Sequence, residues 1–155
     1  MVRYRKLTME ELESMEKEFI DFLVINGIAA DDWIKLKETE PQKADSIVDE
    51  FSNVVFESVL RKAGYLDYVS EKVITCFQAL EKKMVMVVLE LPNDSIIDLT
   101  SQSLNETDPS IIKGARVYTT EKSYQSKREG ELFKLIQKGA SISDGTLFKK
   151  LCLLL

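Results

Sequence analysis

Four carboxylates surround the only tryptophan of the chain. Asp31 and Asp32 directly precede Trp33, and Glu38 and Glu40 follow it within a few residues. Paired carboxylates can bind Mg²⁺ or Ca²⁺, and they can act as general acid and base where burial separates their pKa values. The spacing matches no calcium-binding loop, and aspartates at a helix start are also typical of a cap. Asp31, Asp32 and Trp33 are therefore candidate contacts for a ligand or partner, with capping as the alternative.

A second candidate lies in the last third of the chain. Tyr124, Lys127 and Arg128 combine an aromatic ring with two cations, which is the pairing that a phosphate or a nucleic-acid strand requires. The same composition is common at a polar helix start. Residues 110–155 carry nine basic and four acidic side chains, so this segment is where anions would bind. The net charge of −5 for the whole chain argues against non-specific binding of duplex DNA.

The residue types exclude several catalytic classes. The chain has no histidine, so Ser-His pairs, Cys-His pairs and histidine-based zinc sites cannot form. It also lacks a glycine-rich phosphate loop, a CxxC pair and a GxSxG turn. Cys76 and Cys152 are expected to be thiols in a reducing compartment, with Cys76 a small core residue on a strand. We expect no cofactor, no metal and a role other than catalysis.

Helices are predicted in the first part of the chain. Thr8-Met9-Glu10-Glu11 fits a capping box, and the apolar spacing that follows predicts one helix over residues 9–26, ended by Gly27. Asp31-Asp32 can cap a short helix over residues 33–38. Pro41 suits the first position of a second long helix, which is predicted to end before Gly64.

Strands are predicted after Gly64, over residues 65–69, 73–80 and 84–91, with a hairpin turn at 81–83. Residues 96–99 and 115–120 are candidates for further strands, and the polar segment 101–114 is predicted to be a long mobile loop.

This order predicts one α+β domain over residues 1–155. An antiparallel sheet of three to five strands in the middle (65–121) is packed by two long N-terminal helices (1–64) and two C-terminal helices (122–155).

The final helix raises the question of self-association. Helices are predicted over residues 127–138 and from a Ser143-Asp144 cap to the last residues. An apolar stripe on the final helix consists of Leu147, Phe148, Leu151 and Leu155. Such a stripe either closes the chain's own core or docks on a second copy. Residues 1–50 carry a net charge of −6 and residues 110–155 a net charge of +5, which allows head-to-tail pairing of copies or neutralisation within one fold.

Three segments together resemble a known family. They are Tyr4-Arg5-Lys6-Leu7-Thr8 with Glu10-Glu11-Leu12, Leu60-Arg61-Lys62 with Tyr65-Leu66, and Ile142-Ser143-Asp144-Gly145 with Leu147-Phe148-Lys149 and Leu151. The chain is similar over nearly its whole length to a family of small uncharacterised proteins from Bacteroidetes-type bacteria. The resemblance implies a bacterial, cytoplasmic protein. It implies no activity and no site residues, because the family has none assigned.

Three functions remain open on these grounds. The leading expectation is a non-enzymatic cytoplasmic domain that binds a protein partner or a second copy of itself. The alternative is a small-molecule binding protein or a carboxylate-based enzyme, with a pocket between sheet and helices near Trp33 and the loop 101–114. The third is weak nucleic-acid binding through the basic last third. No stretch approaches the roughly 20 apolar residues of a membrane span, so no membrane association is expected.

Overall fold

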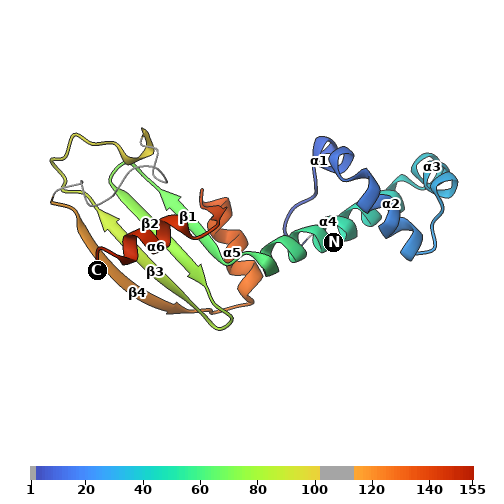
Figure 1. Cartoon of the computed structure of the whole chain (residues 1–155). Coiled ribbons are helices and arrows are strands. Elements are labelled where there is room, and N and C mark those ends of the chain that lie inside the picture. Colours follow the sequence, from blue (N-terminus) through green and yellow to red (C-terminus); the bar gives the residue numbers. More distant parts are fainter. Residues whose placement is uncertain (1–2, 102–113) are drawn as a thin grey trace. The chain divides into compact units, whose positions relative to one another are not determined.

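The computed structural model describes residues 3–101 and 114–155, and its contacts divide the chain into two compact units. Unit 1 consists of residues 1–59 and unit 2 of residues 60–155 (Figure 1). The α+β class is confirmed, with helices before and after a five-stranded antiparallel sheet. Whether the chain behaves as one domain stays a prediction.

Unit 1 begins with two helices where the sequence predicted one. The helices are α1 (Met9–Ser14) and α2 (Glu16–Ile25). The capping box is confirmed, because the Glu11 amide donates to Thr8 Oγ1 at 3.2 Å and the Thr8 amide donates to Glu11 Oε1 at 2.9 Å. The prediction of one continuous helix is wrong at Met15, which leaves helical geometry with φ −113°. Ser14 Oγ donates to the Glu11 carbonyl at 2.7 Å, and this side-chain bond competes with the helical pattern at that point.

The next two helices are α3 (Ala30–Thr39) and α4, which runs from Pro41 to Lys62 as predicted. The predicted cap by Asp31 and Asp32 is wrong, because the cap position is Ala29 and both aspartates lie inside the first turn. There the two carboxylates still oppose the positive end of the helix dipole.

Aromatic rings form the core of unit 1. Leu7, Phe19, Leu23 and Phe51 are buried together. The ring centroids of Phe19 and Phe51 are 5.0 Å apart, and Trp33 meets Phe19 edge-on at 5.2 Å. The apolar faces of these four helices are thus used largely against one another. Ser52, fully buried, accepts from the Leu7 amide at 3.0 Å and donates to the Val48 carbonyl at 2.7 Å.

Unit 2 is built on the sheet, in the strand order β4-β3-β2-β1-β5. Its strands are β1 (Tyr65–Val69), β2 (Val73–Ala79), β3 (Lys83–Glu90), β4 (Arg116–Ser123) and β5 (Ser141–Ser143). The first three and β4 confirm predictions within a few residues. The candidate strand at 96–99 is wrong, because the described chain there is irregular and leads into a short 3-10 helix, Leu99–Ser101. Residues 102–113 of the predicted loop lie outside the described part of the chain.

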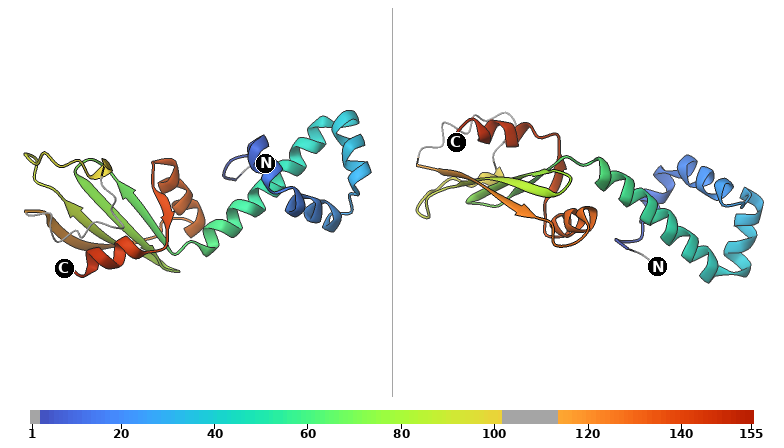
Figure 2. Two further views of the ribbon diagram at one scale, coloured as in Figure 1. Left: turned by 45° about the horizontal axis from the view of Figure 1, so that its top comes forward. Right: turned by 90° about the horizontal axis from the view of Figure 1, so that it is seen from below.

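The two C-terminal helices cover opposite faces of the sheet. They are α5 (Arg128–Gln137) and α6 (Thr146–Cys152), drawn in orange and red in Figure 2. The buried cluster on the α6 face joins strand residues such as Ile74, Val87 and Leu89 to the stripe of α6. The predicted cap by Ser143 and Asp144 is wrong, because the N-cap of α6 is Gly145, with φ +85°. A Cβ at this position would lie 2.6 Å from the Tyr65 ring.

Candidate functional site

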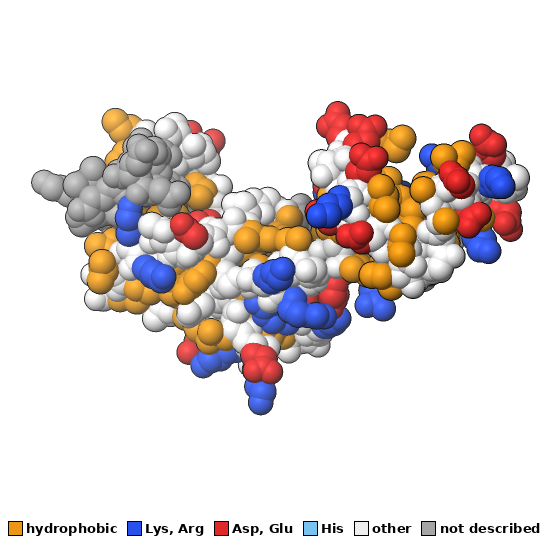
Figure 3. Space-filling model, turned by 45° about the vertical axis from the view of Figure 1, so that its right-hand side comes forward, with side chains coloured by type: hydrophobic (Ala, Val, Ile, Leu, Met, Phe, Trp, Pro, Cys, Tyr) orange, Lys and Arg blue, Asp and Glu red, His pale blue; other side chains and the backbone are white. Residues whose placement is uncertain are grey.

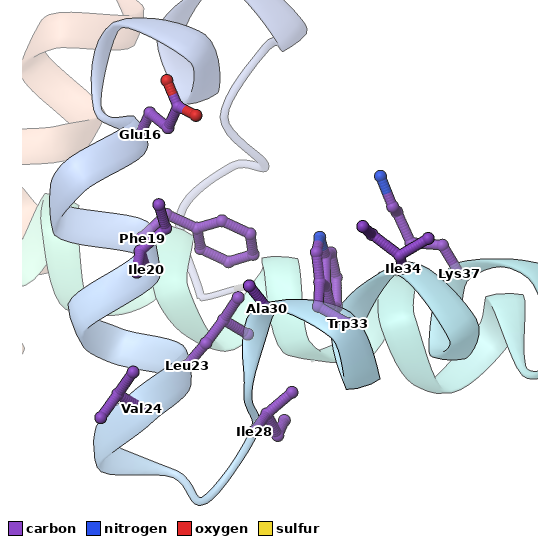
Figure 4. Close-up of a pocket in the computed structure, with 10 residues that line it drawn as sticks. All are labelled: Glu16, Phe19, Ile20, Leu23, Val24, Ile28, Ala30, Trp33, Ile34 and Lys37. Carbon is purple, nitrogen blue, oxygen red and sulfur yellow. The ribbon is translucent and has the colours of Figure 1, made fainter.

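A groove lies between α2 and α3 of unit 1. Its volume is about 280 Å³, and the close-up in Figure 4 shows its lining. The lining residues are Glu16, Phe19, Ile20, Leu23, Val24, Ile28, Ala30, Trp33, Ile34 and Lys37. We call this surface the α2–α3 groove. Eight of these ten side chains are apolar, so the groove favours an apolar occupant.

Helical spacing produces the two walls of the groove. Glu16, Ile20 and Val24 follow one another at four-residue intervals along α2, so they share one face of that helix. Trp33, Ile34 and Lys37 occupy the corresponding face of α3. Figure 4 shows Trp33 between the two walls, with the Phe19 ring on its α2 side.

The floor of the groove is fixed and its walls are exposed. Phe19 and Leu23 are 7% and 2% exposed and belong to the core of unit 1. By contrast, Ile20, Val24 and Ile34 are 42%, 63% and 54% exposed. Branched aliphatic side chains that remain in water beside a preformed aromatic floor have not found a partner within unit 1, and such surfaces typically bind one.

The predicted carboxylate cluster does not line this groove. Asp31 and Asp32 are exposed in the first turn of α3, and Glu38 and Glu40 are exposed near its end. The groove that Trp33 lines is formed by α2, α3 and the turn between them. The pocket predicted between the sheet and the helices, near Trp33 and the loop 101–114, stays a prediction. Within the described residues, no group of three or more metal-ligating side chains is present.

Arg128, one of the three residues of the second candidate, forms hydrogen bonds within unit 2. Its guanidinium donates to the carbonyls of Leu60 at 2.9 Å, Ala79 at 3.0 Å and Leu80 at 3.2 Å, and also to that of Ala63. We call these four bonds the Arg128 clamp. Two of the carbonyls belong to residues at the end of α4, where a cation also offsets the negative end of the helix dipole.

Tyr124 and Lys127, the other two residues of this candidate, lie close to Arg128 in the sequence. The Tyr124 hydroxyl donates to the Leu80 carbonyl at 2.7 Å, and partial burial raises the pKa of the phenol. Lys127 is exposed at the start of α5. The three residues predicted as a phosphate or nucleic-acid contact therefore lie together, but the guanidinium and the phenol already bond backbone oxygens.

Both cysteines are free thiols. Cys76 is fully buried on β2 opposite Asp67 of β1, and burial, followed by the Asp67 charge, raises the pKa of its thiol far above the usual range. Burial also raises the pKa of Cys152. A thiol that stays protonated is a poor nucleophile, so Cys76 is a core residue as predicted.

The apolar stripe of α6 is divided between core and surface. Leu147, Phe148 and Leu151 are 2%, 7% and 0% exposed and pack within unit 2, whereas Leu155 is 60% exposed. The chain itself thus covers three of the four predicted self-association residues, which closes the core of unit 2 and leaves little of them for a second copy.

Sequence reasoning found Trp33 but not the aliphatic walls beside it. Ile20 and Val24 lie off the stripe that predicted the first helix, and Ile34 is one of few apolar residues in a charged segment. Apolar residues outside the core stripe of an amphipathic helix are a signal that could have identified this surface.

A family model matches residues 1–155 and carries the description "Family of unknown function (DUF6495)". The match confirms the resemblance to an uncharacterised family, while an origin in Bacteroidetes-type bacteria stays a prediction. No curated protein and no solved structure matches the chain. None of the helices in the described residues is both long enough and apolar enough to span a bilayer.

Proposed function

Because the chain belongs to this family of unknown function, and the family description names no activity, we propose a function from the α2–α3 groove: unit 1 binds a protein partner by accepting an amphipathic helix in this groove. The partner helix would place apolar side chains at positions i, i+3, i+4 and i+7 between the walls. This is one of the common ways in which proteins recognise a helical segment.

The exposure of Ile20, Val24 and Ile34 beside Trp33 carries this proposal. Removing these aliphatic side chains from water on binding contributes roughly 25 cal/mol per Å² of buried apolar surface. The Phe19 ring of the floor and the Trp33 ring of the α3 wall already pack edge-on against one another, so little side-chain entropy is lost there on binding. A fixed aromatic centre with aliphatic walls is the arrangement expected of an interaction hot spot.

The tryptophan provides a direct test. We suggest a neutral helical peptide of roughly 14 residues, or about four turns, with Leu at the apolar positions and Gln elsewhere. Because Trp33 is the only tryptophan, its fluorescence reports on the groove when the peptide has none. We expect saturable binding with a change in this fluorescence.

A matched pair of variants locates the binding. Ile34→Asp places a charge in the groove wall and should weaken binding at least about tenfold, or about 1.4 kcal/mol. Val54→Asp makes the same change at an equally exposed position on α4 outside the groove lining, and it should leave binding unchanged. Equal effects of the two variants, or no saturable binding, would contradict the proposal.

Self-association is a second candidate, favoured by the 86% and 60% exposure of Leu153 and Leu155. Light scattering at low and high salt tests it, with Leu153→Ser as the variant. A strict monomer in all samples would exclude it. We also propose a cytoplasmic location for the protein, because two free thiols suit a reducing compartment.

The other two expectations have less support. A carboxylate-based enzyme needs two convergent acids, and the groove lining contributes Glu16 without a second carboxylate. Nucleic-acid binding through the basic last third loses one of its named contacts, because the Arg128 guanidinium already bonds four carbonyls.

A further inference from the structure

We infer that the helix accepted by the α2–α3 groove is basic, with Lys or Arg beside its apolar stripe. This inference rests on the proposed function and specifies the partner's chemistry. It follows from the charges that surround the groove rather than from the groove lining itself.

The helices that form and border the groove are strongly acidic. Three bases, Lys17, Lys35 and Lys37, accompany nine acids, which are Glu10, Glu11, Glu13, Glu16, Glu18, Asp21, Asp31, Asp32 and Glu38. Most of these acids are exposed. Figure 3 shows hydrophobic side chains over this part of the molecule with acidic groups on more than one side of them.

The acidic excess is a property of unit 1. Residues 1–59 contain fourteen acidic and seven basic side chains, a net charge of −7, whereas residues 60–155 have a net charge of +2. The negative potential is therefore concentrated on the unit that contains the groove. A cationic helix is attracted to such a surface, while phosphate-bearing partners such as nucleic acids and anionic lipid surfaces are repelled.

The lining itself is balanced in charge. Glu16 contributes an acid, and Lys37 contributes a base whose amine lies 5.9 Å from the centre of the Trp33 ring. The preference for a basic helix must then come from the surrounding carboxylates, which act over longer distances through water. Interactions of this kind mainly raise the association rate and weaken with added salt.

The test compares three peptides with one apolar stripe. All have Leu at the apolar positions, and the remaining positions are filled with Lys, Gln or Glu in the three versions. At low salt we expect the Lys peptide to bind the full-length chain at least about tenfold more tightly than the Glu peptide, with the Gln peptide between them. At about 0.5 M salt the three affinities should converge, since the Debye length falls to a few ångströms.

The outcomes separate this inference from the proposed function. If the Gln peptide binds, Ile34→Asp weakens it and the Lys peptide gains nothing over the Glu peptide, the proposed function stands and the basic partner is excluded. If the Lys peptide binds but the neutral variant Ile34→Ser does not weaken its binding, both are overturned, because the attraction then lies outside the groove. Failure of the Lys peptide to bind at low salt overturns both as well.

Two single-charge variants sharpen the test. Glu16→Gln removes the carboxylate of the groove lining, and Glu50→Gln removes an exposed carboxylate of α4 outside it, so both change the net charge equally. Because Glu16 offsets Lys37 in the lining, Glu16→Gln leaves an unopposed cation there. This variant should weaken binding of the Lys peptide about twofold to fivefold and leave binding of the Gln peptide unchanged. Glu50→Gln should have a smaller effect on the Lys peptide. A larger effect of Glu50→Gln would contradict a contact near the groove.

Discussion

The α2–α3 groove and the Arg128 clamp make opposite use of similar residues. Each combines an aromatic side chain with a cation. Trp33 of the groove, and Tyr124 and Arg128 at the clamp, were predicted as contacts for a ligand or partner, whereas Lys37 was not. In the groove, aliphatic walls remain in water around Trp33, and Lys37 lies over the ring at 5.9 Å. In the clamp, Arg128 bonds four backbone carbonyls and Tyr124 bonds one of them. Availability for binding therefore depends on what the rest of the chain has already satisfied, and less on residue type.

The largest effect is expected from breaking the clamp. Arg128→Met keeps much of the side-chain volume but removes the guanidinium donor from the carbonyls of Ala63 and Ala79, whereas the Leu60 carbonyl still accepts from the Ala63 amide at 3.3 Å. An unsatisfied buried polar group costs about 1–3 kcal/mol, so we expect the free energy of unfolding to fall by about 3 kcal/mol. Denaturant unfolding followed by circular dichroism measures this loss.

Arg128→Lys is the matched control for the clamp. It keeps the charge but loses the planar fork, so it should recover only part of the lost stability. A full recovery would show that the charge matters more than the hydrogen bonds.

A second prediction concerns the close packing of unit 2. Gly145→Ala forces a positive φ on a residue with a Cβ and presses that atom on the Tyr65 ring, so unfolding should become easier by about 2 kcal/mol. Gly130→Ala, inside α5 with open space around its Cβ, should stabilise by about 0.5–1 kcal/mol. Thermal unfolding of the two variants measures both effects. A shift of both melting temperatures in the same direction would contradict this account.

A third prediction concerns the groove. Ile20→Ser and Ile34→Ser remove exposed side chains, so each should change the free energy of unfolding by less than about 0.5 kcal/mol. The same variants should weaken binding of the neutral peptide. A loss of binding without a loss of stability would separate the two effects. A loss of several kcal/mol would show that these walls are part of the core after all.

The smallest effect is a pH dependence at the start of α1. Hydrogen bonds from Arg5 and from the Thr8 amide lower the pKa of Glu11 from 4.5 to about 2. A lowered folded-state pKa gives stability that is present above pH 4.5 and is lost as the pH falls toward 2. Because Glu11 is exposed, we expect only a few tenths of a kcal/mol. Glu11→Gln should lower stability at pH 6 and make no difference near pH 2, as measured by urea unfolding.

Local patterns predicted most of the elements. The helix that starts at Pro41 and the strand over residues 65–69 were predicted correctly, because apolar spacing and terminal Pro or Gly residues mark them within one segment. β5 was missed, since Ser141-Ile142-Ser143 has no strand pattern by itself and pairs with β1 from far along the chain. The break at Met15 was missed because the apolar spacing continues across it, and a local bond such as that from Ser14 Oγ to the Glu11 carbonyl leaves no mark on that spacing.

The sites were harder to predict than the elements. The role of Arg128 depends on carbonyls between 48 and 68 residues away, which no local pattern contains. The groove depends on which face α3 turns toward α2, and this leaves Ile34 exposed while Trp33 meets Phe19. The clamp is set by packing between distant segments and the groove by the packing of two neighbouring helices. Sequence reasoning could therefore name Trp33 and Arg128 without assigning their roles.

The place of β5 at one edge of the sheet has a consequence for synthesis on the ribosome. Leu66 of β1 pairs with Phe77 of β2 in a local hairpin and with Ile142 of β5 near the other end of the sequence. The hairpin can form as soon as it emerges, but the edge of β1 stays open until β5 has been translated. During that interval the nascent strand is a site for mispairing with neighbouring chains, and we expect chaperones to engage it there.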